Sequence, residues 1–204
     1  MSDHDHIAIV LGGTRPHVAL IRRLKEKGYY VILVDYLENP IAKSAADEHI
    51  RESTLDKESV LEIAKNRGAG LVISVAIDQA NVTACYVGEQ LGLPIPYDYQ
   101  TSLRVTDKTL MKQVLIDAGI PTARYAIADG MQETLPSGLR FPVVVKPADS
   151  NSSKAVRTAR DLHELSAAVD IATRASRNAA AIVEEHMEGR EVGIDCIIGQ
   201  SDIH

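Results

Sequence analysis

The first hundred residues alternate short apolar runs with longer segments of helical periodicity, and this alternation constrains the fold more than any other feature of the sequence. The expected strands are residues 7–11, 29–34 and 71–75, and the expected helices are residues 16–28, 57–66 and 81–91. β-Branched residues favour the first pattern, and apolar positions at helical spacing favour the second. Strands and helices in strict alternation, joined by short turns, predict a parallel sheet with helices on both faces.

Glycine and acidic residues follow the expected strands at their carboxyl ends. Gly12 and Gly13 follow the first strand, Asp35 follows the second, and residues 76–78 follow the third. In open α/β sheets, ligands bind outside this edge. The sequence therefore predicts a ligand site built from these turns.

A dinucleotide site is one interpretation of a glycine turn after the first strand and an acid after the second. However, residues 12–17 contain no G-x-G-x-x-G pattern, and Pro16 removes a backbone donor from the helix start that would hold a pyrophosphate. The chain also lacks the G-x-x-x-x-G-K-[ST] pattern of a Walker loop. A nucleotide site of another kind is therefore favoured, and a dinucleotide-binding or regulatory module stays as the alternative.

The composition is that of an ordinary globular protein and favours small molecules as partners. The formal net charge is -6, and no dense cluster of lysine and arginine occurs, which argues against a nucleic acid partner. Cys85 and Cys196 lie far apart in apolar segments, so buried free thiols and a cytoplasmic location are expected. No signal peptide or membrane-spanning run is found. His4 and His6 lack further partners, so no metal site is expected.

The two halves of the chain meet at residues 92–97, where two prolines stop a helix and extend the chain. Asp107 then caps a new helix. Its expected apolar stripe is Leu110, Val114, Leu115 and Ala118. Lys108 lies in the first turn, where the helix dipole disfavours a cation. A phosphate shared with Lys146 would explain that position, and a solvated charge is the alternative.

Lys146 is the most informative single residue, because it leaves an apolar run directly into a loop of small polar residues. The preceding residues 143–145 are all valine and predict a buried strand, while residues 149–153 favour a turn with exposed backbone N–H groups. A cation at a strand end beside such donors is suited to binding a phosphate. The alternative is a surface lysine followed by an ordinary turn.

Two further elements follow this strand. Asp161 and Glu164 have the spacing of a capping box at a helix start. The apolar positions that continue this helix are Leu165, Val169 and Ala172. Residues 179–185 predict a buried strand that ends in two acids, and after a turn at Gly189 residues 192–198 predict another strand.

The order of these pieces resembles the ATP-grasp ligases. A glycine-opened α/β domain is followed by Asp107-Lys108 at a helix start, by F-P-V-V-V-K-P at 141–147 with its small-residue loop, and by V-E-E-x-x-x-G-R-E-V at 183–192. The resemblance covers nearly the whole chain and is nearest to amino-acid ligases, purine-pathway carboxylate-amine ligases and the carbamoyl-phosphate synthase large subunit. It implies a Rossmann-like parallel-sheet domain, residues 1–97, and the first lobe of an ATP-grasp domain, residues 98–204.

The resemblance also implies a reaction and a set of contacts. ATP phosphorylates a small carboxylate and an amine attacks the acylphosphate, so the protein supplies positioning and charge and no catalytic side chain is assigned. The implied ATP contacts are Lys108, Lys146, Ser152, Ser153 and Lys154 at the phosphates, Glu184, Glu185 and Met187 at the adenine, and Glu191 at the ribose. The implied substrate contacts are Gly12, Gly13, Thr14 and Asp78. A homodimer is compatible with the resemblance.

Two departures from the family pattern stand out. Ser152 and Ala155 occupy positions where the phosphate loop of the family usually carries glycine, which allows closer backbone approach. The magnesium-binding Glu and Asn of the family, and an arginine that stabilises the transferred phosphoryl group, lie downstream of the segment matching Glu191, whereas this sequence stops at His204. We therefore expect the N-terminal part of a longer, magnesium-dependent ligase, inactive by itself.

Overall fold

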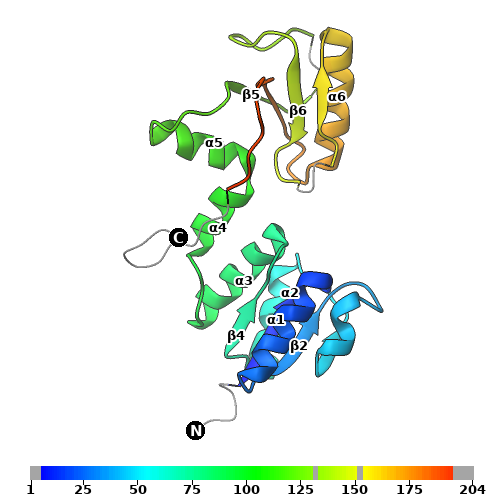
Figure 1. Ribbon diagram of the computed structural model, residues 1–204, viewed down its shortest axis with the longest axis vertical. Helices are drawn as coiled ribbons and strands as arrows, with labels where there is room; N and C mark the ends of the chain where they lie inside the picture. The colour runs from blue at the N-terminus through cyan, green and yellow to red at the C-terminus, as the bar shows by residue number, and fades with distance from the viewer. Residues whose placement is uncertain (1–5, 131–132, 151–153, 195–204) are drawn as a thin grey trace. The chain divides into compact units, whose positions relative to one another are not determined.

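A computed structural model describes residues 6–130, 133–150 and 154–194, which form two compact units, Met1–Pro121 and Thr122–His204. Each unit is described here by itself (Figure 1). Helix α4 (Tyr99–Thr106) packs on α3 (Asp78–Leu91), which is why the first unit extends beyond the prolines at 94 and 96. The domain boundary expected between residues 97 and 98 stays a prediction.

The first unit contains the predicted parallel sheet. Its strands are β1 (Ile7–Leu11), β2 (Tyr30–Val34), β3 (Glu48–Ile50) and β4 (Leu71–Ile73). They are ordered β3-β2-β1-β4, and every neighbouring pair is parallel. Strand β3 was not predicted, since its sequence Glu-His-Ile lacks the apolar run that marks a buried strand.

Helices cover both faces of this sheet, as predicted. They are α1 (Arg15–Glu26), α2 (Lys57–Arg67) and α3, with the short 3-10 helix η1 at Ile41–Ala45. Ile9 and Leu11 of β1 belong to the core formed with α2 and α3, whereas Ala8 and Val10 pack in the core that contains Ile21 of α1. Alternate residues of a strand point to opposite faces, so one strand supplies both cores.

The segment after α3 is held by the helix and not by the sheet. Leu93 N–H donates to the carbonyl of Gly88 at 2.8 Å. A Cβ atom built on Gly88 would lie 2.2 Å from Cγ2 of Ile95, so the glycine allows Ile95 to pack directly on the backbone of α3. This contact fixes the course of the chain along one edge of the sheet.

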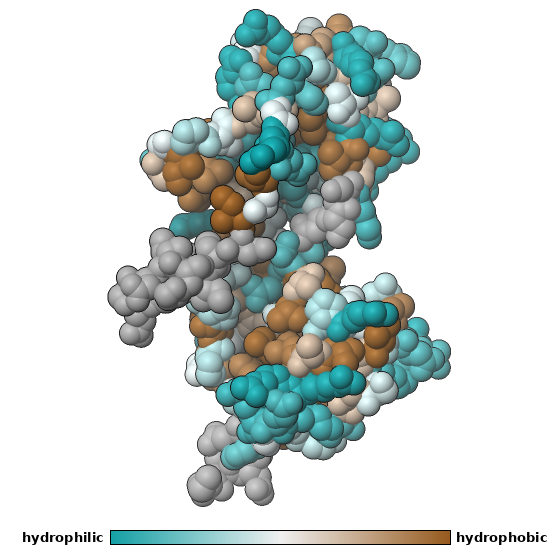
Figure 2. Space-filling view, viewed as in Figure 1, coloured by the Kyte–Doolittle hydropathy of each residue, from teal (hydrophilic) through white to brown (hydrophobic). Residues whose placement is uncertain are grey.

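Helix α5 (Lys108–Asp117) confirms the predicted cap and corrects the predicted face. Asp107 Oδ1 accepts a hydrogen bond from the backbone N–H of Thr109 at 2.8 Å. Leu110 and Val114 of the expected buried stripe are 44% and 43% exposed. Apolar side chains accordingly colour the surface of α5 in Figure 2. The less exposed positions are Lys108, Thr109, Met111, Lys112 and Leu115. Lys112 is buried on this face, and a pattern of apolar and polar residues does not predict a buried lysine.

The second unit is an antiparallel sheet with a helix on it. Its strands are β5 (Tyr125–Ala128), β6 (Val143–Pro147), β7 (Arg157–Ala159) and β8 (Ala181–Glu185), in the order β5-β8-β6-β7. Helix α6 (Leu162–Ala175) begins at Asp161, whose side chain accepts from Glu164 N–H at 2.8 Å. The predicted stripe of Leu165, Val169 and Ala172 is fully buried against β6 and β8.

Two observations complete the fold. Of the strand expected at 192–198, residues 192–194 are not in a strand and the remainder lies outside the described residues. Within the described part of the chain, no helix has both the length and the apolar character needed to cross a bilayer.

Replacing Gly88 by alanine tests the contact with Ile95. Overpacking costs roughly 1–3 kcal/mol, and the gain in helix propensity returns at most about 1 kcal/mol. We expect Gly88→Ala to lower the free energy of unfolding by about 1 kcal/mol in urea titrations. Gly130→Ala is the control, because a Cβ atom there meets nothing within 4 Å. Equal effects of the two substitutions would contradict the packing role.

Candidate functional site

The turn after β1 is tied to the end of β2 by a carboxylate. Gly13 N–H donates to Asp35 Oδ2 at 2.7 Å, and Leu37 N–H donates to Asp35 Oδ1 at 2.8 Å. Asp35 is only 6% exposed. Both oxygens therefore accept hydrogen bonds within the fold, and the carboxylate is largely shielded from solvent. This argues against the dinucleotide interpretation.

Close packing explains why this turn contains two glycines. Gly12 has a φ of +107°, and a Cβ atom there would lie 2.7 Å from Nε2 of His17. A Cβ atom on Gly13 would lie 2.2 Å from Cβ of Pro40. Both glycines are buried, whereas Thr14 is exposed. Of the expected substrate contacts in this turn, only the Thr14 side chain reaches solvent, and the substrate roles stay predictions.

His17 is a residue of this edge that sequence reasoning missed. It is fully buried, and its Nδ1 accepts a hydrogen bond from Thr14 N–H at 3.2 Å and lies 2.8 Å from Thr14 Oγ1. Accepting at Nδ1 places the proton of the neutral ring on Nε2. Burial lowers the pKa of His17, which keeps the ring neutral beside the positive end of α1. The Thr-x-x-His spacing at a helix start is the sequence signal that could have identified this pair as a helix cap.

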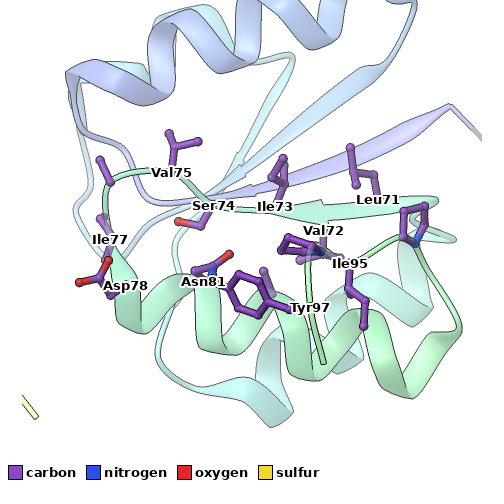
Figure 3. Close-up of a pocket in the computed structure, with 14 residues that line it drawn as sticks. Leu71, Val72, Ile73, Ser74, Val75, Ile77, Asp78, Asn81, Ile95 and Tyr97 are labelled. Atoms are coloured by element: carbon purple, nitrogen blue, oxygen red, sulfur yellow. Dashed lines mark hydrogen bonds between the residues drawn. The ribbon is translucent and has the colours of Figure 1, made fainter. Parts of the chain in front are cut away.

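A pocket of about 500 Å³ opens beside β4, the edge strand of the sheet. Its walls come from β4 and the turn after it, from α3, and from the segment 94–97 (Figure 3). Asn81 Nδ2 donates to Tyr97 Oη at 2.6 Å. Asp78, an expected substrate contact, lies at the end of the pocket where α3 begins. Ala76 in the same turn has a φ of 58°, a conformation that costs a non-glycine residue roughly 1–2 kcal/mol.

In the second unit, Lys146 and Glu184 form an ion pair. Lys146 lies opposite Ile182 in the β6–β8 ladder and Glu184 lies opposite Val144, so the two charged side chains are diagonal neighbours on one face. Nζ of Lys146 is 2.5 Å from Glu184 Oε1, and the side chains are 20% and 13% exposed. Lys146 is thus not the solvated surface lysine that the sequence left as an alternative. The structure brings together the residues expected at the two ends of ATP.

The residues after Glu184 are differently placed. Glu185 pairs with Arg124 at 2.9 Å, and hydrogen bonding to this guanidinium lowers the pKa of the Glu185 carboxyl. The Glu185 N–H donates to the Arg124 carbonyl, so it is already used by the fold. Met187 is 68% exposed, and Glu191 is also exposed. The adenine and ribose roles of these residues stay predictions.

The expected phosphate loop is anchored where it begins. Asp149 is 6% exposed and accepts hydrogen bonds from the Arg177 N–H at 3.1 and 3.2 Å. Ala155 has a φ of 58°, which favours the glycine that the family usually carries there. Lys154 is exposed. Ser152 and Ser153 lie outside the described residues.

Lys108 and a metal site are the remaining features expected of the nucleotide site. Lys108 begins α5 in the first unit, so the phosphate that it was expected to share with Lys146 stays a prediction. Among the described residues, no group of three or more His, Cys, Asp or Glu side chains is arranged to hold a metal ion.

The second half of the chain is similar to a known protein family and to curated proteins. Residues 114–204 match the model described as D-ala D-ala ligase C-terminus. The chain is 31% identical over 115 residues to a D-alanine–D-alanine ligase of Gloeobacter violaceus, covering 53% of this chain and 37% of that protein. It is 28% identical over 178 residues to a formate-dependent phosphoribosylglycinamide formyltransferase of Thioalkalivibrio sulfidiphilus, covering 83% and 43%.

Solved structures extend the similarity to the whole fold. An L-amino acid ligase from Bacillus licheniformis superposes with a TM-score of 0.73 at 18% identity, covering 100% of this chain and 50% of that one. An ADP complex of N5-carboxyaminoimidazole ribonucleotide synthetase gives 0.69 at 20% identity, covering 90% and 47%. The chain thus spans at most about half the length of these relatives.

Acid titration tests the neutral state of His17. A pKa lowered below its ordinary value of 6.5 means that the unfolded chain takes up a proton first, so stability falls as pH falls below 6.5. We expect urea unfolding to show a loss of stability from about pH 7 to pH 5 that is smaller in His17→Gln, which keeps an acceptor but does not titrate. A pH dependence in His17→Gln equal to that of the wild type would contradict the neutral state of the buried ring.

A double-mutant cycle tests the Lys146–Glu184 pair. With both side chains at least 80% shielded, we expect Lys146→Met and Glu184→Gln to show a coupling energy of about 1–2 kcal/mol in chemical unfolding. The exposed pair Arg174–Asp170 is the control, and its coupling should stay below about 0.5 kcal/mol. A Lys146–Glu184 coupling as small as that of the control would show that the pair is only a surface contact.

Proposed function

We propose that the chain is an ATP-grasp ligase, that its second unit binds ATP, and that the whole protein joins a carboxylate to an amine through an acylphosphate. The observation that carries the proposal is the pairing of Lys146 with Glu184 on one face of the antiparallel sheet. These are the residues that the family pattern assigns to phosphate and adenine. The names of the relatives support the reaction, since D-alanine–D-alanine ligase and L-amino acid ligase both denote ligation of amino acids.

The pair suits a nucleotide site because each partner can exchange the other for the ligand. A phosphate oxygen offers Lys146 a charge-assisted hydrogen bond in place of the carboxylate. Glu184, an acceptor only, is then available to the amino group of adenine. Before the nucleotide binds, the ion pair keeps two largely shielded charges compensated, and an uncompensated charge at this position would be costly.

The chemistry requires little from the side chains beyond position and charge. Phosphoryl transfer to a carboxylate concentrates negative charge on the phosphate oxygens, and a fixed cation such as Lys146 stabilises that charge. Magnesium would supply further neutralisation when bound. The described residues do not form a site for it, so its ligands are not assigned within them.

The first unit is proposed to bind the substrates at the carboxyl edge of its parallel sheet. Thr14 and Asp78 present polar groups there, and Gly12 and Gly13 shape the turn. The alternative of a binding module without chemistry is distinguished by turnover. ADP formation that requires both a carboxylate and an amine would be incompatible with that alternative.

Nucleotide titration tests the proposal on the chain itself. We expect calorimetry to detect ATP binding that Lys146→Met weakens at least about tenfold, since a charged phosphate contact contributes roughly 1.5–3 kcal/mol. Glu184→Gln should reduce the preference for ATP over GTP. Lys65→Met, at an exposed helix position, is the matched control and should bind like the wild type. Failure of the chain to bind ATP, or equal binding by Lys146→Met, would reject the proposed site.

A further inference from the structure

A groove with a volume of about 820 Å³ runs between α1 and η1 in the first unit. Hydrogen bonds hold the two helices together at both ends of this α1–η1 groove. The Ala42 N–H of η1 donates to the Gly13 carbonyl at 3.0 Å, in the turn that precedes α1. Just after η1, Asp47 pairs with Lys25 of α1 at 2.5 Å, and its second oxygen accepts from the Val31 N–H at 2.9 Å. The groove is therefore a fixed feature of the fold.

Two arginines of α1 give the α1–η1 groove a positive charge that the fold does not compensate. Arg15 and Arg22 line the groove, and both are exposed. In the part of the chain that the structure describes, neither guanidinium has a hydrogen-bond or ion-pair partner. The other charged residues of the lining, Lys25 and Glu26, are paired within the first unit. The groove thus favours an anionic partner, although the chain as a whole carries a net charge of -6.

The spacing of the two arginines indicates the size of that partner. Arg15 and Arg22 lie two helical turns apart on one face of α1, which separates their Cα atoms by roughly 10 Å along the helix axis. A single carboxylate or inorganic phosphate is too small to contact both guanidinium groups. Acidic residues seven positions apart on a second helix repeat at the same spacing on one face. An acidic helix lying along α1 would therefore pair with both arginines.

Small and apolar residues between the charges suit the packing of a helix. Ile41 of η1 is 64% exposed, and the small residues Ala19 of α1 and Ser44 of η1 are exposed on the two walls. Small side chains allow a helix to approach closely, and Ile41 offers it an apolar contact. A nucleic acid fits this lining less well, because Glu26 would repel its phosphates and Ile41 would gain no partner.

From these observations we propose that the α1–η1 groove docks an acidic amphipathic helix of a partner protein. The acidic residues of this helix pair with Arg15 and Arg22, and its apolar residues pack on Ile41 and Ala19. In such a complex the apolar contacts supply affinity, and the charges supply orientation and selectivity. The inference goes beyond the proposed ligase reaction and does not depend on it, since none of these residues is assigned to ATP or to a substrate.

Three labelled helical peptides test the inference on the full chain by fluorescence anisotropy. The acidic peptide has three heptads with Leu at the first and fourth positions, Glu at the fifth and seventh, and Ala or Gln elsewhere. The basic peptide replaces every Glu by Lys, and the polar peptide replaces every Leu by Ser. We expect the acidic peptide to bind at least about tenfold more tightly than the other two. Its affinity should fall as salt is added, because salt screens exposed charges. Equal binding of the acidic and basic peptides would overturn the inference.

Substitutions at exposed positions identify the groove as the docking site. The double substitution Arg15→Glu and Arg22→Glu should weaken the acidic peptide at least about tenfold and bind the basic peptide more tightly than the wild type does. Ile41→Ser should weaken the acidic peptide at least about threefold. Lys65→Glu, at an exposed position of α2 outside the groove, is the control and should keep the wild-type affinity. Wild-type affinity in the double variant, or an equal loss in the control, would overturn the inference.

Two other occupants of the groove are distinguished by further measurements. A second copy of the chain would appear in sedimentation as a dimer that Ile41→Ser dissociates. An anionic membrane would appear as binding to phosphatidylserine vesicles that the double arginine variant loses. Either result without binding of the acidic peptide would overturn the inference. In spectra of isoleucine methyl groups, we expect the acidic peptide to shift Ile41 and not Ile182 of β8 in the second unit. The absence of a shift at Ile41 would also overturn it.

Discussion

The carboxylate of Asp35 is the interaction on which the architecture of the first unit depends. It accepts the N–H of Gly13 from the turn after β1 and the N–H of Leu37 from the turn after β2, so the carboxyl ends of two neighbouring strands share one acceptor. The Gly13 carbonyl in turn accepts from Ala42 N–H at 3.0 Å, which brings η1 to the same turn. A buried acceptor with both oxygens used fixes this edge of the sheet before any ligand binds.

Much of this fold could be predicted because its elements carry strong local signals. The valines of β6, the alternating packing of β1 and the cap at Asp161 all follow from residue type and spacing. The orientation of α5 could not, since Lys112 takes a buried position that a pattern of apolar residues does not predict. Strand β3 also escaped prediction, because a three-residue strand with two polar residues owes its existence to its neighbour β2.

The two candidate sites also differ in whether the sequence carries a signal for them. Lys146 and Glu184 could be paired from sequence because a family pattern assigns both to one ligand, and the β6–β8 register supplies the physical reason for their proximity. The pocket beside β4 carried no such signal. It depends on Pro94, Pro96 and a contact at Gly88 acting together, and none of these residues has a reactive side chain. A pocket that is formed by packing and by prolines without a backbone N–H is not found by searching the sequence for reactive side chains.

The packing of Ile95 on Gly88 also has a consequence for how this fold can vary during evolution. The contact lies on α3, and Ile95 lines the pocket beside β4. Substitutions at Gly88 or Ile95 would reshape this pocket without changing Lys146, Glu184 or the turn at Gly12. Packing at this pocket and charge at the Lys146–Glu184 pair can therefore change independently of each other.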